Sequence, residues 1–158
     1  VVALWVSGLV MSRLASDDLV AEAVREHVRA SLDNRQIEVA SSDQHTVKPW
    51  LSARLDYSPP VQDLSGEGFA LVGGRLDTLG GQRVATLVYR YRLHTIDVFV
   101  RPAPAPASDE PRTIRGFHAA HASGGGMDYV AVSDAGEDAL GALAQSLARA
   151  RDAGESVP

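Results

Sequence analysis

The chain has 158 residues, of which 45% are hydrophobic and 22% are charged. These proportions suit one globular domain and exclude a wholly disordered or collagen-like chain. The formal net charge is −5, which argues against a nucleic-acid-binding surface, because such a surface needs clustered cations. Cysteine is absent, so disulfides, cysteine-based zinc sites and a cysteine nucleophile are excluded.

The amino-terminal segment, Val1 to Met11, carries no charge. A membrane-spanning helix needs about 20 apolar residues, and this segment supplies about half of that number. Two interpretations stay open: the segment is a first helix that packs on the core, or it is the end of a transmembrane helix that begins before Val1. The few basic residues that follow fit the non-cytoplasmic side of a membrane.

A helix is expected over residues 16–35. A serine and two aspartates at its start supply a capping oxygen and acids at the positive end of the helix dipole. Val20, Val24 and Val28 then recur at helical spacing. If this helix pairs with its copy in a homodimer, these valines form part of the seam.

Shorter elements are expected before the main strands begin. Residues 37–40 suit a short strand. Pro49 suits the first turn of a short helix, where a missing N–H leaves no hydrogen bond unmade. Pro59 and Pro60 keep their segment extended, because each proline biases the residue before it away from helix.

The hydrophobic period changes to two at Phe69, which indicates β-strands. Strands are expected over 69–77, 84–91, 94–100, 113–122 and 127–133. In the last helix, Leu140, Leu143, Ala144 and Leu147 form an apolar stripe. Because short turns join the strands, we expect an α+β fold: an antiparallel meander sheet of about five strands with the N- and C-terminal helices packed on one face of it.

Two local patterns carry further expectations. Gly73 and Gly74 lie inside a strand pattern, which indicates a β-bulge or the close approach of another backbone. His118 and His121 are three residues apart, so on a strand they point to opposite faces. We expect one of the two to face the core and the other to face water, rather than a metal-binding pair.

The chain shows no catalytic motif. It has no Gly-x-Ser-x-Gly elbow and no phosphate-binding Gly-x-x-x-x-Gly-Lys loop, so we expect neither an enzyme nor a bound cofactor. His45 and His94 are the candidate ligands for a metal, provided that the segment around Trp50 packs against the sheet edge. The alternative is that they are hydrogen-bonded structural histidines.

Several unusual strings occur in a fixed order, among them His45-Thr-Val-Lys-Pro-Trp50, Leu55-Asp-Tyr-Ser-Pro-Pro-Val61, Leu71-Val-Gly-Gly-Arg-Leu-Asp77 and Gly126-Met-Asp-Tyr129. Their order and spacing resemble the extracytoplasmic part of proteobacterial membrane-anchored anti-sigma factors (transmembrane transcriptional regulators), from about Glu26 to Leu147. The residues that match the family's motif positions are His45, Lys48, Pro49, Trp50, Pro59, Pro60, Gly73, Gly74, Arg75 and His94. The family offers no catalytic residue to carry over.

The resemblance implies a single-pass protein of the inner membrane. Residues 1–15 would be the end of the transmembrane helix and a linker, residues 16–152 a periplasmic sensor domain, and residues 153–158 a disordered tail. The protein would bind an extracytoplasmic-function sigma factor through a cytoplasmic region outside this chain and regulate it during envelope or chemical stress. The alternative is a periplasmic module that binds a metal or small ligand through His45 and His94.

Overall fold

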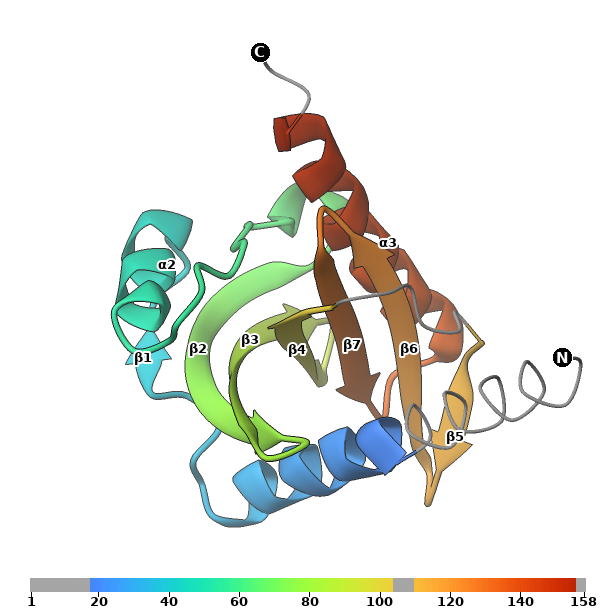
Figure 1. The fold of residues 1–158 in the computed structure, drawn as a ribbon. Coiled ribbons are helices and arrows are strands. Elements are labelled where there is room, and N and C mark those ends of the chain that lie inside the picture. Colours follow the sequence, from blue (N-terminus) through green and yellow to red (C-terminus); the bar gives the residue numbers. More distant parts are fainter. Residues whose placement is uncertain (1–17, 104–109, 156–158) are drawn as a thin grey trace, which may run out of the picture.

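The structure is a computed structural model that describes residues 18–103 and 110–155. It is an α+β fold built on one antiparallel sheet of seven strands (Figure 1). The strands are β1 (Val39–Ala40), β2 (Ala70–Leu79), β3 (Gln82–Tyr91), β4 (His94–Pro102), β5 (Arg112–Ile114), β6 (Phe117–Gly124) and β7 (Met127–Ser133). Their order across the sheet is β1-β2-β3-β4-β7-β6-β5. The strands β1 to β4 and the strands β5 to β7 each lie in chain order, and the two groups meet where β4 pairs with β7.

The expectation of about five strands is wrong. The predicted strand over 113–122 is two strands, because Arg115 and Gly116 both have positive φ angles, of 53° and 84°, and form the turn between β5 and β6. The short strand expected at 37–40 is confirmed as β1, which pairs with β2 at the opposite edge. These two additions account for the seven strands.

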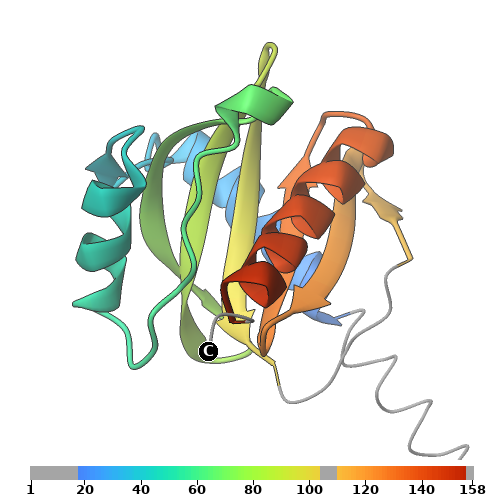
Figure 2. The same cartoon turned by 90° about the horizontal axis from the view of Figure 1, so that it is seen from above.

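The helices cover both faces of the sheet, which corrects the expectation that they share one face. The N-terminal helix, residues 18–32, lies on one face. The helices α2 (Gln44–Ser52) and α3 (Glu137–Glu155) lie on the other (Figure 2). The central strands explain this arrangement: residues 84–89 of β3 and all of β7 are buried. A strand buried on both sides needs a covering layer on each side.

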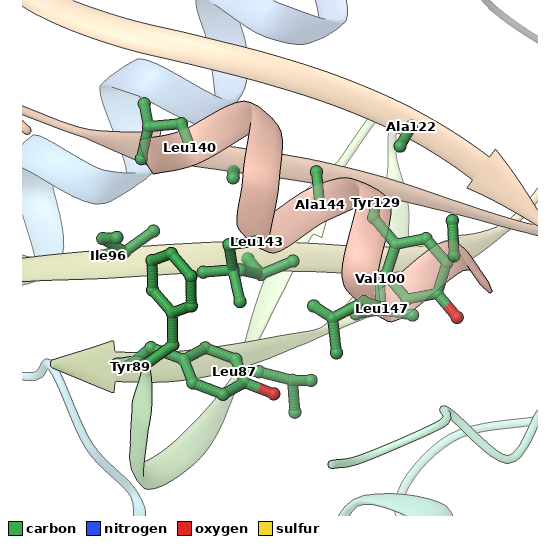
Figure 3. Packing of buried hydrophobic residues seen from close by; sticks show 14 of the residues in the cluster. Leu87, Tyr89, Ile96, Val100, Ala122, Tyr129, Leu140, Leu143, Ala144 and Leu147 are labelled. Atoms are coloured by element: carbon green, nitrogen blue, oxygen red, sulfur yellow. The ribbon is translucent and has the colours of Figure 1, made fainter. Parts of the chain in front are cut away.

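On the α2 and α3 face, the apolar stripe of α3 packs into the main core (Figure 3), as its spacing predicts. Leu140, Leu143 and Leu147 are each no more than 2% exposed. They meet side chains from four strands, namely Leu87, Tyr89, Ile96, Val100, Ala122 and Tyr129. α3 runs on to Glu155, into the segment expected to be disordered, and residues 156–158 lie outside the described part.

α2 packs beside this core, over the edge formed by β1 and β2. Val47 and Leu51 are fully buried there, and the side chain of Asp43 caps the helix by accepting a hydrogen bond from the N–H of His45. Pro49 lies inside α2 rather than in its first turn, because Asp43 starts the helix earlier than the proline suggests.

On the opposite face, the N-terminal helix buries Val20, Ala23 and Val24 against the sheet. A homodimer through this helix would therefore use other positions than Val20 and Val24. Of the described residues, no helix is long and apolar enough to cross a membrane. Val1 to Met11, the segment to which the transmembrane expectation refers, lies outside them.

Gly73 shows both features that its position predicts. The register between β2 and β3 shifts at this glycine, which marks a bulge. Its φ angle is 156°, and a Cβ on it would lie 2.3 Å from the carbonyl oxygen of Val39 and 2.8 Å from Cγ2 of Ile37. A glycine is needed here because β1 pairs with β2 at the bulge and its backbone leaves no room for a side chain.

We expect Gly73→Ala to lower the free energy of unfolding by about 2 kcal/mol or more, since the added methyl group forces β1 away from β2. Urea unfolding followed by circular dichroism measures this change. Gly66→Ala is the matched control, because a Cβ at Gly66 meets nothing within 4 Å. Equal stability of the two variants would contradict the close approach at Gly73.

Candidate functional site

A group of ionisable side chains is buried between the N-terminal helix and the sheet. His27, Arg75, Asp77 and Asp97 are each no more than 5% exposed. Charged groups are almost never buried to this extent unless they are paired, because loss of hydration costs several kcal/mol for each ion. Such a group therefore needs a specific arrangement of partners, and the structure shows one.

Arg75, on β2, lies at the centre of this ion network. Its Nε donates a hydrogen bond to Oδ2 of Asp77 at 2.7 Å, and its Nη2 donates to Oδ2 of Asp97 at 2.7 Å. The hydroxyl of Thr86, on β3, donates to the same Asp77 oxygen at 2.7 Å. The network thus connects the three neighbouring strands β2, β3 and β4 on one face of the sheet.

The same network holds the N-terminal helix. Nδ1 of His27 lies 2.7 Å from Oδ2 of Asp97, and the His27 ring packs edge-on against Phe117 with the centroids 5.4 Å apart. Beyond the helix, the carbonyl of Gln36 accepts a hydrogen bond from Nη1 of Arg75 at 3.1 Å. The helix and the segment after it are therefore fixed to the sheet by charged contacts as well as by apolar ones.

The periods of the strands and of the N-terminal helix explain why these side chains meet between the sheet and the helix. Arg75 and Asp77 alternate along β2 and so point to one face. Thr86 lies opposite Arg75 in the register between β2 and β3. His27 continues the buried stripe of the helix, one turn after Val24.

The network favours the charged form of its acids. Burial alone would raise the pKa of Asp97, but hydrogen bonds from His27 and Arg75, together with the positive charge of Arg75, lower it overall. Burial also opposes the charge of Arg75, yet Asp97 and Asp77 raise its pKa above the usual value. A lowered carboxyl pKa stabilises the fold above about pH 4, and that contribution is lost as the pH falls through the folded-state pKa.

A second buried acid lies on the same face of the sheet. Oδ1 of Asp128 accepts a hydrogen bond from the Ser123 hydroxyl at 2.6 Å and lies 3.2 Å from Nε2 of His121. Its Oδ2 accepts from Nη2 of Arg101 at 3.2 Å. His121 is thus the inward-facing member of the predicted pair, while His118 reaches the other face, where its Nδ1 lies 3.4 Å from Oε1 of Glu137 at the start of α3.

The predicted candidates His45 and His94 lie on different elements. His45 is exposed on α2, and Nδ1 of His94, on β4, lies 2.9 Å from Oδ1 of Asp134. Within residues 18–103 and 110–155, no hydrogen bond or ion pair joins the two histidines, and no group of three or more His, Asp or Glu side chains could hold a metal ion. A metal role for this pair stays a prediction.

The remaining motif residues have structural positions. Lys48 and Pro49 are exposed on α2, Trp50 is half-buried, and Pro59 and Pro60 are buried. Gly74 lies under α2, where a Cβ added to this glycine would be 3.2 Å from Cγ1 of Val47. Of the whole motif, only Arg75 belongs to the ion network.

Sequence reasoning missed His27, Asp77, Thr86 and Asp97 as one group. The available signal was an acid in the middle of an apolar strand: Asp97 follows Ile96 and precedes Val98. An ionised residue at such a position predicts a buried partner. The pattern does not name that partner, because His27 lies 70 positions away in the chain.

A scan against models of protein families and a search of curated proteins find no match to this chain. The chemistry of the network therefore has to be read from its geometry. Each member is at most 5% exposed, so no carboxylate or imidazole is offered to a substrate. An arginine that holds two carboxylates and, through one of them, a histidine is suited to linking elements rather than to catalysis.

We expect Asp97→Asn to lower the free energy of unfolding by about 3 kcal/mol at neutral pH, because it leaves the positive charge of Arg75 partly uncompensated in the interior. Urea unfolding at a series of pH values measures this. The difference from the wild type should stay constant above about pH 5 and narrow as the pH falls below about 4, because Asp97 then takes up a proton in the unfolded chain before it does so in the folded protein, where its pKa is lowered.

The matched control is Arg29→Gln, on the exposed side of the same helix. Arg29 pairs with Glu26 at 2.8 Å, and its side chain is 61% exposed. Removing such a surface ion pair should change the stability by less than about 0.5 kcal/mol. A similar loss of unfolding free energy in Asp97→Asn and Arg29→Gln would contradict a special role for the buried network. So would a stability difference between Asp97→Asn and the wild type that does not depend on pH.

Proposed function

We propose that the chain is the extracytoplasmic sensor domain of a single-pass inner-membrane anti-sigma factor, which regulates an extracytoplasmic-function sigma factor in response to envelope or chemical stress. The order and spacing of the motif strings support the proposal, from His45 through Arg75 to Tyr129. In this proposal a cytoplasmic region outside the chain binds the sigma factor, and the domain itself is neither an enzyme nor a nucleic-acid-binding module.

The observation that carries the proposal is the ion network between the N-terminal helix and the sheet. A transmembrane sensor needs an element with two discrete states whose balance the signal changes. The helix of residues 18–32 follows the apolar segment Val1 to Met11 in the chain, and it is held to the sheet through His27 and Asp97. In the proposal, this helix transmits a change in the sheet toward the membrane.

The geometry of the network supports a switch with two states rather than a gradual response. Its hydrogen bonds of 2.7 Å link His27, Asp97 and Arg75 in series. A shift of the helix by about 1 Å would stretch such a bond beyond its useful range, and a broken contact would leave buried charge unpaired. Partly displaced positions of the helix are thus disfavoured over the docked position and over a fully released one.

We expect the full-length protein, but not residues 17–158, to retain the cognate sigma factor in a pull-down, because the proposal assigns sigma binding to the cytoplasmic region. Co-purification of the sigma factor with each tagged form measures this. Circular dichroism confirms that the shorter form is folded. Retention of the sigma factor by folded residues 17–158 would contradict this division of roles.

We also expect Asp97→Asn in the full-length protein to change transcription from a sigma-dependent promoter by about fivefold or more in unstressed cells, a typical size for coupling between sites. A reporter gene measures the transcription, and an immunoblot of membranes confirms equal amounts of protein. Arg29→Gln, on the exposed face of the helix, should leave the reporter unchanged. Equal reporter levels in all three strains would contradict transmission through the ion network.

A further inference from the structure

A cavity of about 450 Å³ opens at the end of the sheet where β3 and β4 separate. The pairing of these strands runs from Tyr91 and His94 to Ala85 and Val100 and stops there. β3 nevertheless begins earlier, at Gln82, and β4 continues to Pro102. The ends of the two strands, which pair with β2 and β7 but not with each other, form two walls of the cavity, and the loop of residues 54–57 forms the third.

Tyr57 holds this opening in place. Its hydroxyl donates a hydrogen bond to the carbonyl of Val100 at 2.6 Å and accepts one from the N–H of Ala85 at 2.9 Å. The side chain thus bridges β3 and β4 at their last paired residues. Burial raises the pKa of Tyr57, so the hydroxyl keeps the proton that it donates at neutral pH.

The lining of the cavity is strongly basic. Arg54, Arg83 and Arg101 contribute to it, and among the described residues that line it Asp56 is the only acid. This contrasts with the chain as a whole, in which 20 acidic residues outnumber 15 basic ones. Three arginines in the walls of one opening give it a positive potential, which attracts anions from solution.

Two of these arginines are held in place by neighbouring groups. Arg54 donates from Nη1 to the carbonyl of Trp50 at 2.9 Å, and its guanidinium lies 4.1 Å from the centre of the Trp50 ring. Arg101 pairs through Nη2 with Asp128, but its buried Nε has no hydrogen-bond partner among the described residues. Because that nitrogen is shielded from solvent, Arg101 contributes positive charge to the wall of the cavity rather than this donor.

We propose that this cavity binds a small ligand through an oxyanion group, a phosphate or a carboxylate, held by Arg54 and Arg83 and attracted by the charge of Arg101. The planar guanidinium group matches the geometry of such oxyanions with two parallel hydrogen bonds. The volume of the cavity lies in the range of small-molecule sites. The inference concerns binding alone and does not depend on the proposed regulation of a sigma factor.

Isothermal titration calorimetry of the 158-residue chain with inorganic phosphate and with citrate tests the proposal. We expect saturable binding of at least one anion, weakened about tenfold or more by Arg83→Gln, because one charge-assisted hydrogen bond is lost. Arg54→Gln should act in the same direction. Both arginines are exposed, so neither substitution removes a group that the fold buries.

Arg90→Gln is the matched control, because Arg90 is exposed on the same strand as Arg83 but lies outside the cavity. It should leave the affinity unchanged. Equal weakening by Arg90→Gln and Arg83→Gln would overturn the proposal, since it would indicate a general charge effect.

Sedimentation with vesicles distinguishes a free ligand from a lipid headgroup. One supporting outcome is that the protein binds phosphatidylglycerol vesicles but not phosphatidylcholine vesicles, and that Arg83→Gln abolishes this binding. The lipid headgroup would then be the source of the phosphate. Absence of saturable binding to both free anions and to both kinds of vesicle would overturn it.

Discussion

The guanidinium of Arg75 is the group on which the arrangement of this domain depends. It is fully buried, and it donates to Asp77, to Asp97 and to the carbonyl of Gln36. Burying an arginine is favourable only while its acceptors stay in place around it. The positions of β2, β4 and the segment that follows the N-terminal helix are therefore coupled through one side chain.

The two faces of the sheet are stabilised by different chemistry. Under α3 the contacts are apolar, with Leu140, Leu143 and Leu147 packed on the sheet. Under the N-terminal helix, the apolar contacts of Val20 and Val24 are combined with the ion network. Apolar surfaces tolerate small shifts and substitutions, whereas short charged hydrogen bonds require one position. We infer that α3 mainly stabilises the sheet, while the helix of residues 18–32 is held in one defined place.

β4 connects the two parts of the molecule for which we propose functions. Asp97, in the middle of β4, is hydrogen-bonded to both His27 and Arg75. Arg101, near the end of β4, lines the basic cavity and pairs with Asp128. These two residues lie on the same face of the same strand. An anion in the cavity would thus interact with the charge of Arg101, on the strand that also holds the N-terminal helix, which offers a physical route from a ligand to the helix.

The sequence by itself determined the local features of the domain. The period of two located the central strands to within a few residues, the leucine stripe located α3, and the glycine pair located the bulge on β2. It did not determine the number of strands, because nothing in the residue type of Arg115 signals its positive φ angle. The one local signal was Gly116, since glycine readily takes a positive φ angle, but a single glycine inside a strand pattern also suits a bulge.

Only the tertiary structure decided which face each helix covers and which charges meet. Periodicity reports that a residue is buried but not on which side of a sheet the covering helix lies. The partner of Asp97 is even less visible, since His27 is 70 positions away and the register of three strands has to be in place before Arg75 can reach both acids. Local patterns arise from neighbours along the chain, whereas a buried ion network arises from residues that only folding brings together.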